Sequence, residues 1–309
     1  MAYGKKLKIL GAIIGKSLIF GLSILFTGKL ARTSDVLDVL ALRFLISAIF
    51  LLLFRQIGII KVNYKNKNLK MLAFAAILEP LIYYSVETLG ITYSSTTISG
   101  TILSLISAVI ILGEFFILKY KFDIRTTGLV LLRIIGAIII STAGVSSGTT
   151  TVIGIIFLLL TVFTDAAYVL FLKKLTADFA PIEIVFFTAL IGAAVFNSAN
   201  LARHIYNGSV VHYFDTLLIP ENFAGLLYLG LGATIIAMFL TTYVMKHVKP
   251  SYMSAFGGLS TIITILSGVI VNKEIPDAYQ IVGIILLLSG AVGASFLPES
   301  ANSKNGGKK

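Results

Sequence analysis

Residues 70–91, KMLAFAAILEPLIYYSVETLGI, form an apolar stretch long enough to cross a lipid bilayer, yet they include Glu79 and Glu87. A membrane span needs about 20 mostly apolar residues. A charge near the bilayer centre costs roughly 2.5–3.5 kcal/mol on insertion scales. Each carboxylate must therefore face another charge or a wet cavity. The stretch predicts a membrane helix that handles something polar.

The same combination recurs along the chain. Charged residues lie in five further positions within apolar stretches: Lys16, Arg43, Glu114, Arg133 and Asp165. Of the 309 residues, 57% are hydrophobic and only 13% are charged, with a mean hydropathy of +0.96. Average soluble proteins carry about 25% charged residues. The composition therefore predicts a polytopic membrane protein whose main partner is the lipid bilayer.

Several functional classes are disfavoured by what the sequence lacks. The chain has no cysteine, which excludes disulfides and thiolate metal sites. It has no phosphate loop, Gly-x-Ser-x-Gly or His-Glu-x-x-His motif. His204 and His212, eight residues apart without clustered acids, make a poor metal site. We therefore expect no enzyme, no cofactor, no metal and no ATP-driven pump.

Basic residues indicate the topology. Ten spans are predicted, at residues 9–28, 35–54, 70–91, 96–118, 126–145, 153–173, 182–200, 223–245, 251–271 and 279–297. With the N-terminus inside, 18 Lys and Arg residues lie in inside segments and 4 in outside segments. This positive-inside pattern predicts a multi-pass protein of the cytoplasmic membrane with both termini cytoplasmic. It also explains the net charge of +11 without nucleic acid.

The chain contains an internal repeat. A shift of 154 residues places Gly136 on Gly290 and Ser107 on Thr261. The predicted organisation is an N-terminus (1–8), a first repeat (9–145), a linker (146–152), a second repeat (153–297) and a disordered tail (298–309). Five spans per repeat, an odd number, put the two halves in opposite orientations. We predict an all-α membrane protein of ten helices in two inverted five-helix repeats.

Five segments resemble the drug/metabolite transporter superfamily in its ten-span form with two EamA-type repeats. They are ALRFLIS (41–47), LGITYSSTTISGTILSL (89–105), LLYLGLGATIIA (226–237), KPSYMSA (249–255) and Lys273-Glu274. The resemblance implies a permease with a central cavity lined mainly by spans 1, 3, 4, 6, 8 and 9. The chain departs from the pattern at Phe20, where Trp is frequent, and at Tyr120, where an acid is frequent. Ser107 and Thr261 replace mid-span prolines, which puts the usual kinks of spans 4 and 9 in doubt.

Five residues are predicted to contact substrate: Glu79, Tyr83, Asp165, Tyr168 and Lys16. Spacings of four place Glu79, Tyr83 and Glu87 on one helical face. Asp165 lies near the centre of span 6, and Lys16 lies near the centre of span 1. The alternative role for each charge is an ion pair that locks helices together.

The other charged positions favour gating or structural roles. We assign Arg43, Glu87 and Glu114 to gating or ion pairs. Arg133, on a span that the resemblance makes peripheral, is predicted to pack against Glu114 or to form a subunit contact in a homodimer. Small residues on spans 4 and 9 favour close helix packing over substrate contact. They are Ser99, Gly100, Thr101, Ser104 and Ser107 on the first, and Ser254, Ala255, Gly257, Gly258 and Ser260 on the second.

The leading hypothesis is a secondary transporter for a small polar or amphipathic metabolite, an amino acid or a drug-like cation. It would work by alternating access, with protons as candidate coupling ions. One alternative is a nucleotide-sugar or sugar-phosphate exchanger, which needs convergent Lys and Arg residues where only Lys16 is well placed. The other is a membrane enzyme or a non-transporting sensor or scaffold.

Overall fold

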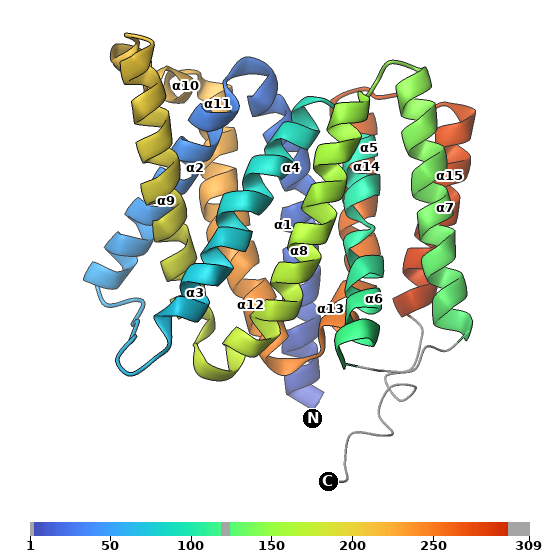
Figure 1. Cartoon of the computed structure of the whole chain (residues 1–309), viewed down its shortest axis with the longest axis horizontal. Coiled ribbons are helices and arrows are strands. Elements are labelled where there is room, and N and C mark those ends of the chain that lie inside the picture. Colours follow the sequence, from blue (N-terminus) through green and yellow to red (C-terminus); the bar gives the residue numbers. More distant parts are fainter. Residues whose placement is uncertain (1–2, 119–123, 296–309) are drawn as a thin grey trace.

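Helices make up all the regular structure in the part of the chain that the computed structural model describes, residues 3–118 and 124–295 (Figure 1). The predicted disordered tail, Tyr120, and the side chains of Ser254 and Ala255 lie outside what is described. The α-helices are α1 (Tyr3–Thr33), α2 (Val36–Gln56), α3 (Leu69–Ala76), α4 (Tyr83–Thr92), α5 (Thr96–Leu103), α6 (Ile106–Leu118), α7 (Ile124–Ser146), α8 (Val152–Asp178), α9 (Pro181–Tyr206), α10 (Asp215–Leu218), α11 (Pro220–Leu227), α12 (Met238–His247), α13 (Pro250–Ala255), α14 (Gly257–Val271) and α15 (Ala278–Ser295).

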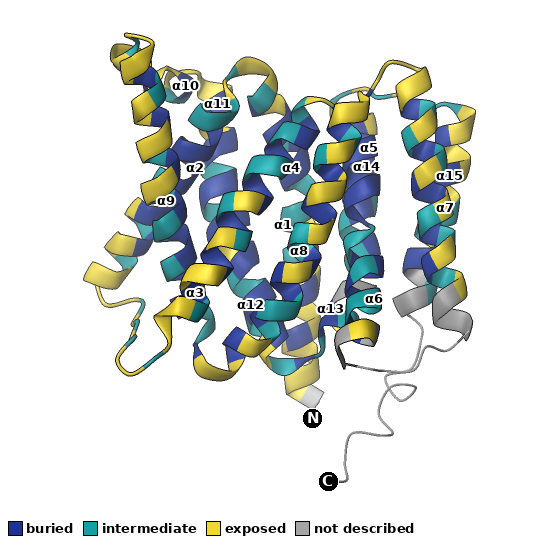
Figure 2. Ribbon diagram, viewed as in Figure 1, coloured by how far each residue is buried: buried dark blue, intermediate teal, exposed yellow. Residues whose placement is uncertain are grey.

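Nine helical stretches among the described residues are long and apolar enough to cross a membrane. A shorter apolar helix, Ala278–Ala291, lies in α15. The prediction of an all-α membrane protein is confirmed, and the count of ten spans stays a prediction. Figure 2 shows buried residues gathered between the helices and exposed ones on their outer faces. Many exposed side chains are large and apolar, as on a surface that meets lipid: examples are Leu52, Phe163 and Ile285.

Corresponding spans of the two halves are interrupted in the same way. In span 3, a π-helical segment, Ile77–Ile82, joins α3 to α4. In span 8, a second one, Tyr228–Ala237, joins α11 to α12. Span 4 is divided into α5 and α6, and span 9 into α13 and α14. Such breaks are frequent at functional sites because they free backbone groups and redirect side chains.

The breaks in spans 4 and 9 form without proline. Near the break of span 4, the Ser104 hydroxyl donates to Thr101 O at 2.7 Å, and the Ser107 hydroxyl donates to Ser104 O at 2.8 Å. In span 9 the Ser260 hydroxyl donates to Gly257 O at 2.8 Å. Hydroxyls that bond nearby carbonyls compete with the helical ladder and bend it. Serine and glycine therefore supply the break that proline would otherwise give.

The peripheral helices α7 and α15 pack side by side, as Figure 1 shows at one edge of the bundle. Their contact depends on glycine. A Cβ atom at Gly136 of α7 would lie 2.6 Å from Gly283 O and 2.8 Å from Leu287 N of α15. Backbone atoms cannot give way as a flexible side chain can. The two helices can therefore approach this closely only with glycine at position 136.

We predict that Gly136→Ala lowers the melting temperature of the detergent-solubilised protein. Alanine normally stabilises a helix interior by about 0.8–1.0 kcal/mol relative to glycine. A lower melting temperature would therefore report the collision of the added Cβ with α15. Gly128→Ala is the matched control in the same helix, because a Cβ there meets nothing within 4 Å. Equal stability of the two variants in thermal unfolding would contradict the packing.

Candidate functional site

A cavity of about 120 Å³ lies among the spans of both halves. Its lining comes from spans 1, 3, 4, 6, 8 and 9, the six that the resemblance implied. The charged and phenolic lining residues are Lys16, Glu79, Tyr83, Glu87, Asp165 and Tyr168. All five predicted substrate contacts are thus brought together, with Glu87 beside them. Their role in binding stays a prediction.

Glu79 lies at the break of span 3. Its backbone is extended, with φ −138° and ψ 116°, inside an otherwise helical stretch. The next residue, Pro80, has no N–H to donate to the helix. The carboxylate is 5% exposed and lines the cavity. The predicted common face of Glu79, Tyr83 and Glu87 therefore forms across a break rather than along one continuous α-helix.

The Lys16 ammonium carries the one positive charge among the described lining residues, which hold three carboxylates. Its nearest polar contact is Met253 Sδ at 4.0 Å, and it lies 5.5 Å from the centre of the Phe20 ring. No ion pair within 4.0 Å joins it to a described carboxylate. Asp165 and Glu79 attract it over a longer distance. The lysine is therefore held near the acids without being locked to either.

Two tyrosines bring hydroxyl donors to the same cavity. Tyr83 Oη donates to Glu87 Oε1 at 2.8 Å, which occupies one of that carboxylate's acceptor sites. Tyr168 Oη is buried and has no hydrogen-bond partner in the structure. A buried hydroxyl without a partner is costly, so Tyr168 has bonding capacity to offer a molecule in the cavity.

Arg43 does not line the cavity. It is 1% exposed, donates from Nε to Thr234 Oγ1 at 2.8 Å, and lies with its guanidinium carbon 4.1 Å from the Tyr84 ring centre. Within the described residues it forms no ion pair closer than 4.0 Å. Cation–π and hydrogen-bond contacts thus take the place of an ion pair at Arg43, and its gating role stays a prediction. These contacts join span 2 to spans 3 and 8.

Glu114 and Arg133 do not pair with each other. Glu114 Oε1 accepts a hydrogen bond from Ser251 N at 3.1 Å. Arg133 is 1% exposed, and its Nη1 donates to Ser107 Oγ of the cavity wall. Arg133 Nε and Nη2 have no partner in the structure. The predicted packing of Arg133 against Glu114 is wrong because the guanidinium reaches Ser107, seven residues before Glu114 on the same span.

The small residues of spans 4 and 9 divide between two roles. Gly100, Ser104, Ser107, Gly257 and Ser260 line the cavity. Ser99, Thr101 and Gly258 are buried away from it, as close packing requires. Further lining residues that the sequence analysis did not single out include Met238, Thr241, Met253 and Thr264. Their only sequence signal is their place on spans 8 and 9.

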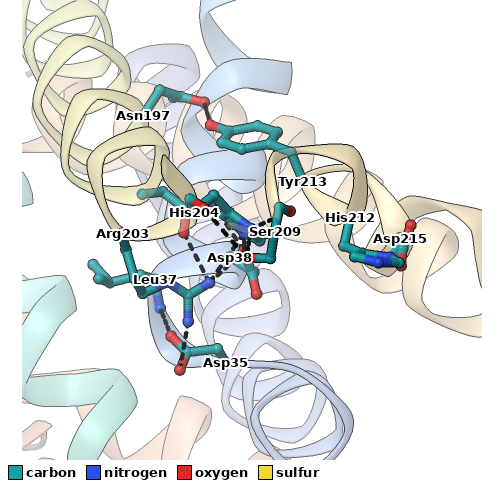
Figure 3. A network of polar contacts seen from close by, with 11 residues as sticks. Asp35, Leu37, Asp38, Asn197, Arg203, His204, Ser209, His212, Tyr213 and Asp215 are labelled. Atoms are coloured by element: carbon teal, nitrogen blue, oxygen red, sulfur yellow. Dashed lines mark hydrogen bonds and ion pairs between the residues drawn. The ribbon is translucent and has the colours of Figure 1, made fainter. Parts of the chain in front are cut away.

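A second polar cluster joins α2 to α9 away from the cavity (Figure 3). Asp38 Oδ1 contacts Arg203 Nη2 at 2.7 Å and His204 Nε2 at 2.9 Å. Nearby, Tyr213 donates to Asn197 Oδ1 at 2.6 Å, and burial raises the pKa of this hydroxyl. No group of three metal-ligating side chains occurs among the described residues. His204 is a buried residue of α9, and its ring contacts Asp38.

Helices with broken midpoints around a buried, charged and partly unpaired cavity define a multi-pass membrane transporter. The EamA-like transporter family matches residues 7–142 and 152–296, so the chain belongs to this family, within the drug/metabolite transporter superfamily. The chain is 28% identical over 296 residues to a protein of Bacillus subtilis (strain 168), "Uncharacterized transporter YcxC", covering 96% of this chain and 95% of that one. A crystal structure described without a function aligns with a TM-score of 0.65 at 15% identity, covering 92% of this chain and 96% of that one.

We predict that Arg133→Met leaves the melting temperature unchanged or raises it. A buried guanidinium with two unpartnered nitrogens costs stability, and an apolar side chain of similar length removes that cost. Ser107→Ala removes the partner of Nη1 and should cost about 1–3 kcal/mol when Arg133 is present. It should cost little in the Arg133→Met background. Thermal unfolding of this double-mutant cycle measures the coupling. A markedly lower melting temperature of Arg133→Met alone would contradict the prediction and show that Nε and Nη2 have a binding partner.

Proposed function

We propose that the protein is a secondary transporter of small cations or zwitterions and that its two inverted halves work by alternating access. The observation that carries this proposal is the lining of one cavity by Glu79, Glu87 and Asp165 with a single ammonium, Lys16. Three carboxylates around one base favour an amine or zwitterionic substrate over an anion. The apolar remainder of the lining suits a metabolite, amino acid or drug-like cation with an apolar part.

The size of the cavity supports a small substrate. Its volume is about 120 Å³, whereas an apolar protein cavity of about 150 Å³ holds a benzene molecule. A nucleotide sugar is far larger and carries phosphates that need several bases. Among the described lining residues Lys16 is the only base. The geometry therefore favours the amine or zwitterion over the exchanger substrates.

Protons are the coupling ions that the site supports best. Glu79 is a buried carboxylate and Asp165 a half-buried one, and neither has an ion pair within 4.0 Å among the described residues. A buried carboxyl group can release its proton when a cationic substrate arrives and take it back when the substrate leaves. We propose this exchange in the cytoplasmic membrane, with both termini in the cytoplasm as the basic residues predict.

We predict that Glu79→Gln and Asp165→Asn each reduce substrate-induced charge movement at least about tenfold, since losing a charge-assisted interaction costs about 1.5–3 kcal/mol. The substrate used is the compound that most stabilises the purified protein in a thermal-shift screen of matched amines, zwitterions and carboxylates. Currents are then recorded from proteoliposomes on solid-supported membranes.

Asp178→Asn is the control, because Asp178 is an exposed acid at the end of α8, outside the cavity. It should leave the currents unchanged. Intact charge movement in both cavity variants would refute proton exchange at these carboxylates. Stabilisation by carboxylates alone would refute the preference for cations or zwitterions.

A further inference from the structure

Glu274, on the loop after α14, holds the start of a span in the other half of the chain. Its two carboxylate oxygens accept hydrogen bonds from Thr96 N and Thr97 N, each at 2.8 Å. These are the first two residues of α5. Asn272 supports the contact, because its Nδ2 donates to Thr96 Oγ1 at 2.9 Å. The carboxylate that follows α14 of span 9 thus links spans 9 and 4 at this end by accepting from the backbone of span 4.

The loop is shaped to deliver this carboxylate. Lys273 has φ 56°, in the left-handed region, and Glu274 N donates to Gly268 O at 3.1 Å. A Cβ atom at Gly268 would lie 2.8 Å from Glu274 Oε2 and 2.8 Å from Thr97 Oγ1. Glycine at position 268 therefore leaves the space that the carboxylate and Thr97 occupy.

Glu114 makes the reciprocal contact at the opposite face. It lies near the end of α6 in span 4, and its Oε1 accepts from Ser251 N at 3.1 Å, at the start of span 9. Figure 1 shows α5 beginning at the face opposite the start of α1, and α6 ending at the face where α1 starts. We call the latter the N-terminal face. The repeat shift of 154 places Glu274 on Tyr120, so the sequence repeat alone does not align the two acids.

The two contacts lie at the two ends of one antiparallel helix pair. α5 packs against α14, and α6 packs against α13. Between the ends, Ser104 and Ser107 of span 4 and Ser260 and Thr261 of span 9 line the cavity. Both spans line the cavity, so separation of their ends at one face would open it toward that face. That separation breaks the carboxylate contact at the same face and leaves the other one intact.

We propose that Glu274 and Glu114 are reciprocal positioning residues of the transport cycle: Glu274 holds the cavity closed at the face opposite the N-terminus, and Glu114 holds it closed at the N-terminal face. The proposal rests on alternating access as the proposed function. Among the described residues, Glu274 accepts hydrogen bonds from two backbone N–H groups of the facing span, whereas Glu114 accepts one, from Ser251 N. Loss of Glu274 therefore shifts the population of open states further than loss of Glu114.

The absence of cysteine from the chain allows a direct test without substrate. Thr241→Cys places one thiol in the cavity on span 8, away from the two moving ends. Its rate of labelling by a membrane-impermeant maleimide is measured from each side of the membrane. An N-terminal tag identifies the N-terminal side.

Glu274→Gln should raise labelling from the side opposite the N-terminus about three- to tenfold and lower it from the N-terminal side. This is the population shift expected for losing one or two hydrogen bonds. Glu114→Gln should do the reverse, by a smaller factor. Gly268→Ala, which crowds the carboxylate without removing it, should act in the same direction as Glu274→Gln and is the second variant if the latter does not fold.

Asp277→Asn is the matched control on the same loop. Asp277 Oδ1 accepts from Gln280 N at 2.8 Å within its own half, so the variant should leave both rates unchanged. The proposal is overturned if Glu274→Gln and Gly268→Ala change neither rate, or change both in the same direction. Labelling of the Thr241→Cys protein from one side only, in every condition, would instead overturn alternating access itself.

Discussion

The cost of exposing a charge to lipid is the constraint on which the arrangement of this protein depends. Glu79, Asp165 and Lys16 come from spans 3, 6 and 1 and meet in one cavity. Each would be costly facing lipid, and together they give the cavity a charged lining. The structure keeps them close without an ion pair within 4.0 Å among the described residues. A closed ion pair would neutralise the site, whereas the open arrangement leaves charge available for a substrate or a proton.

The broken helices change which side chains point into the cavity. A continuous α-helix satisfies its own backbone and presents a fixed stripe of side chains. The π-helical segments of spans 3 and 8 and the interruptions of spans 4 and 9 change that stripe near the cavity. Glu79 shows the effect, since its extended backbone lies where the helical ladder is interrupted. Breaks at corresponding places in both halves follow from the duplicated sequence.

The convergence of Glu79, Asp165 and Lys16 was predictable because a charged residue in an apolar span must face the protein interior rather than lipid. The sequence could not predict how Arg133 is turned. Hydropathy fixes that a helix spans the membrane, but its rotation depends on packing against neighbours. The contacts of Glu114 and Glu274 were also beyond prediction, because their partners are backbone N–H groups that every residue except proline carries. The break of span 4 was in doubt without proline, since serine hydroxyls bend a helix only where the local geometry lets them reach a carbonyl.

The two halves are held together by two kinds of polar contact. Spans 2 and 7 are joined near one face by Asp38 with Arg203, and Lys67, on the segment after span 2, pairs with Glu183 of span 7 at 2.6 Å. Spans 4 and 9 are joined by carboxylates on neutral N–H groups. Both kinds are charge-assisted, and the basic side chains of the two ion pairs are partly exposed, so solvent weakens those pairs. No described residue of spans 2 and 7 lines the cavity, whereas spans 4 and 9 both do. The ion pairs thus lie on spans away from the cavity, and the carboxylate contacts with backbone N–H groups lie on the two spans whose ends the proposed cycle separates.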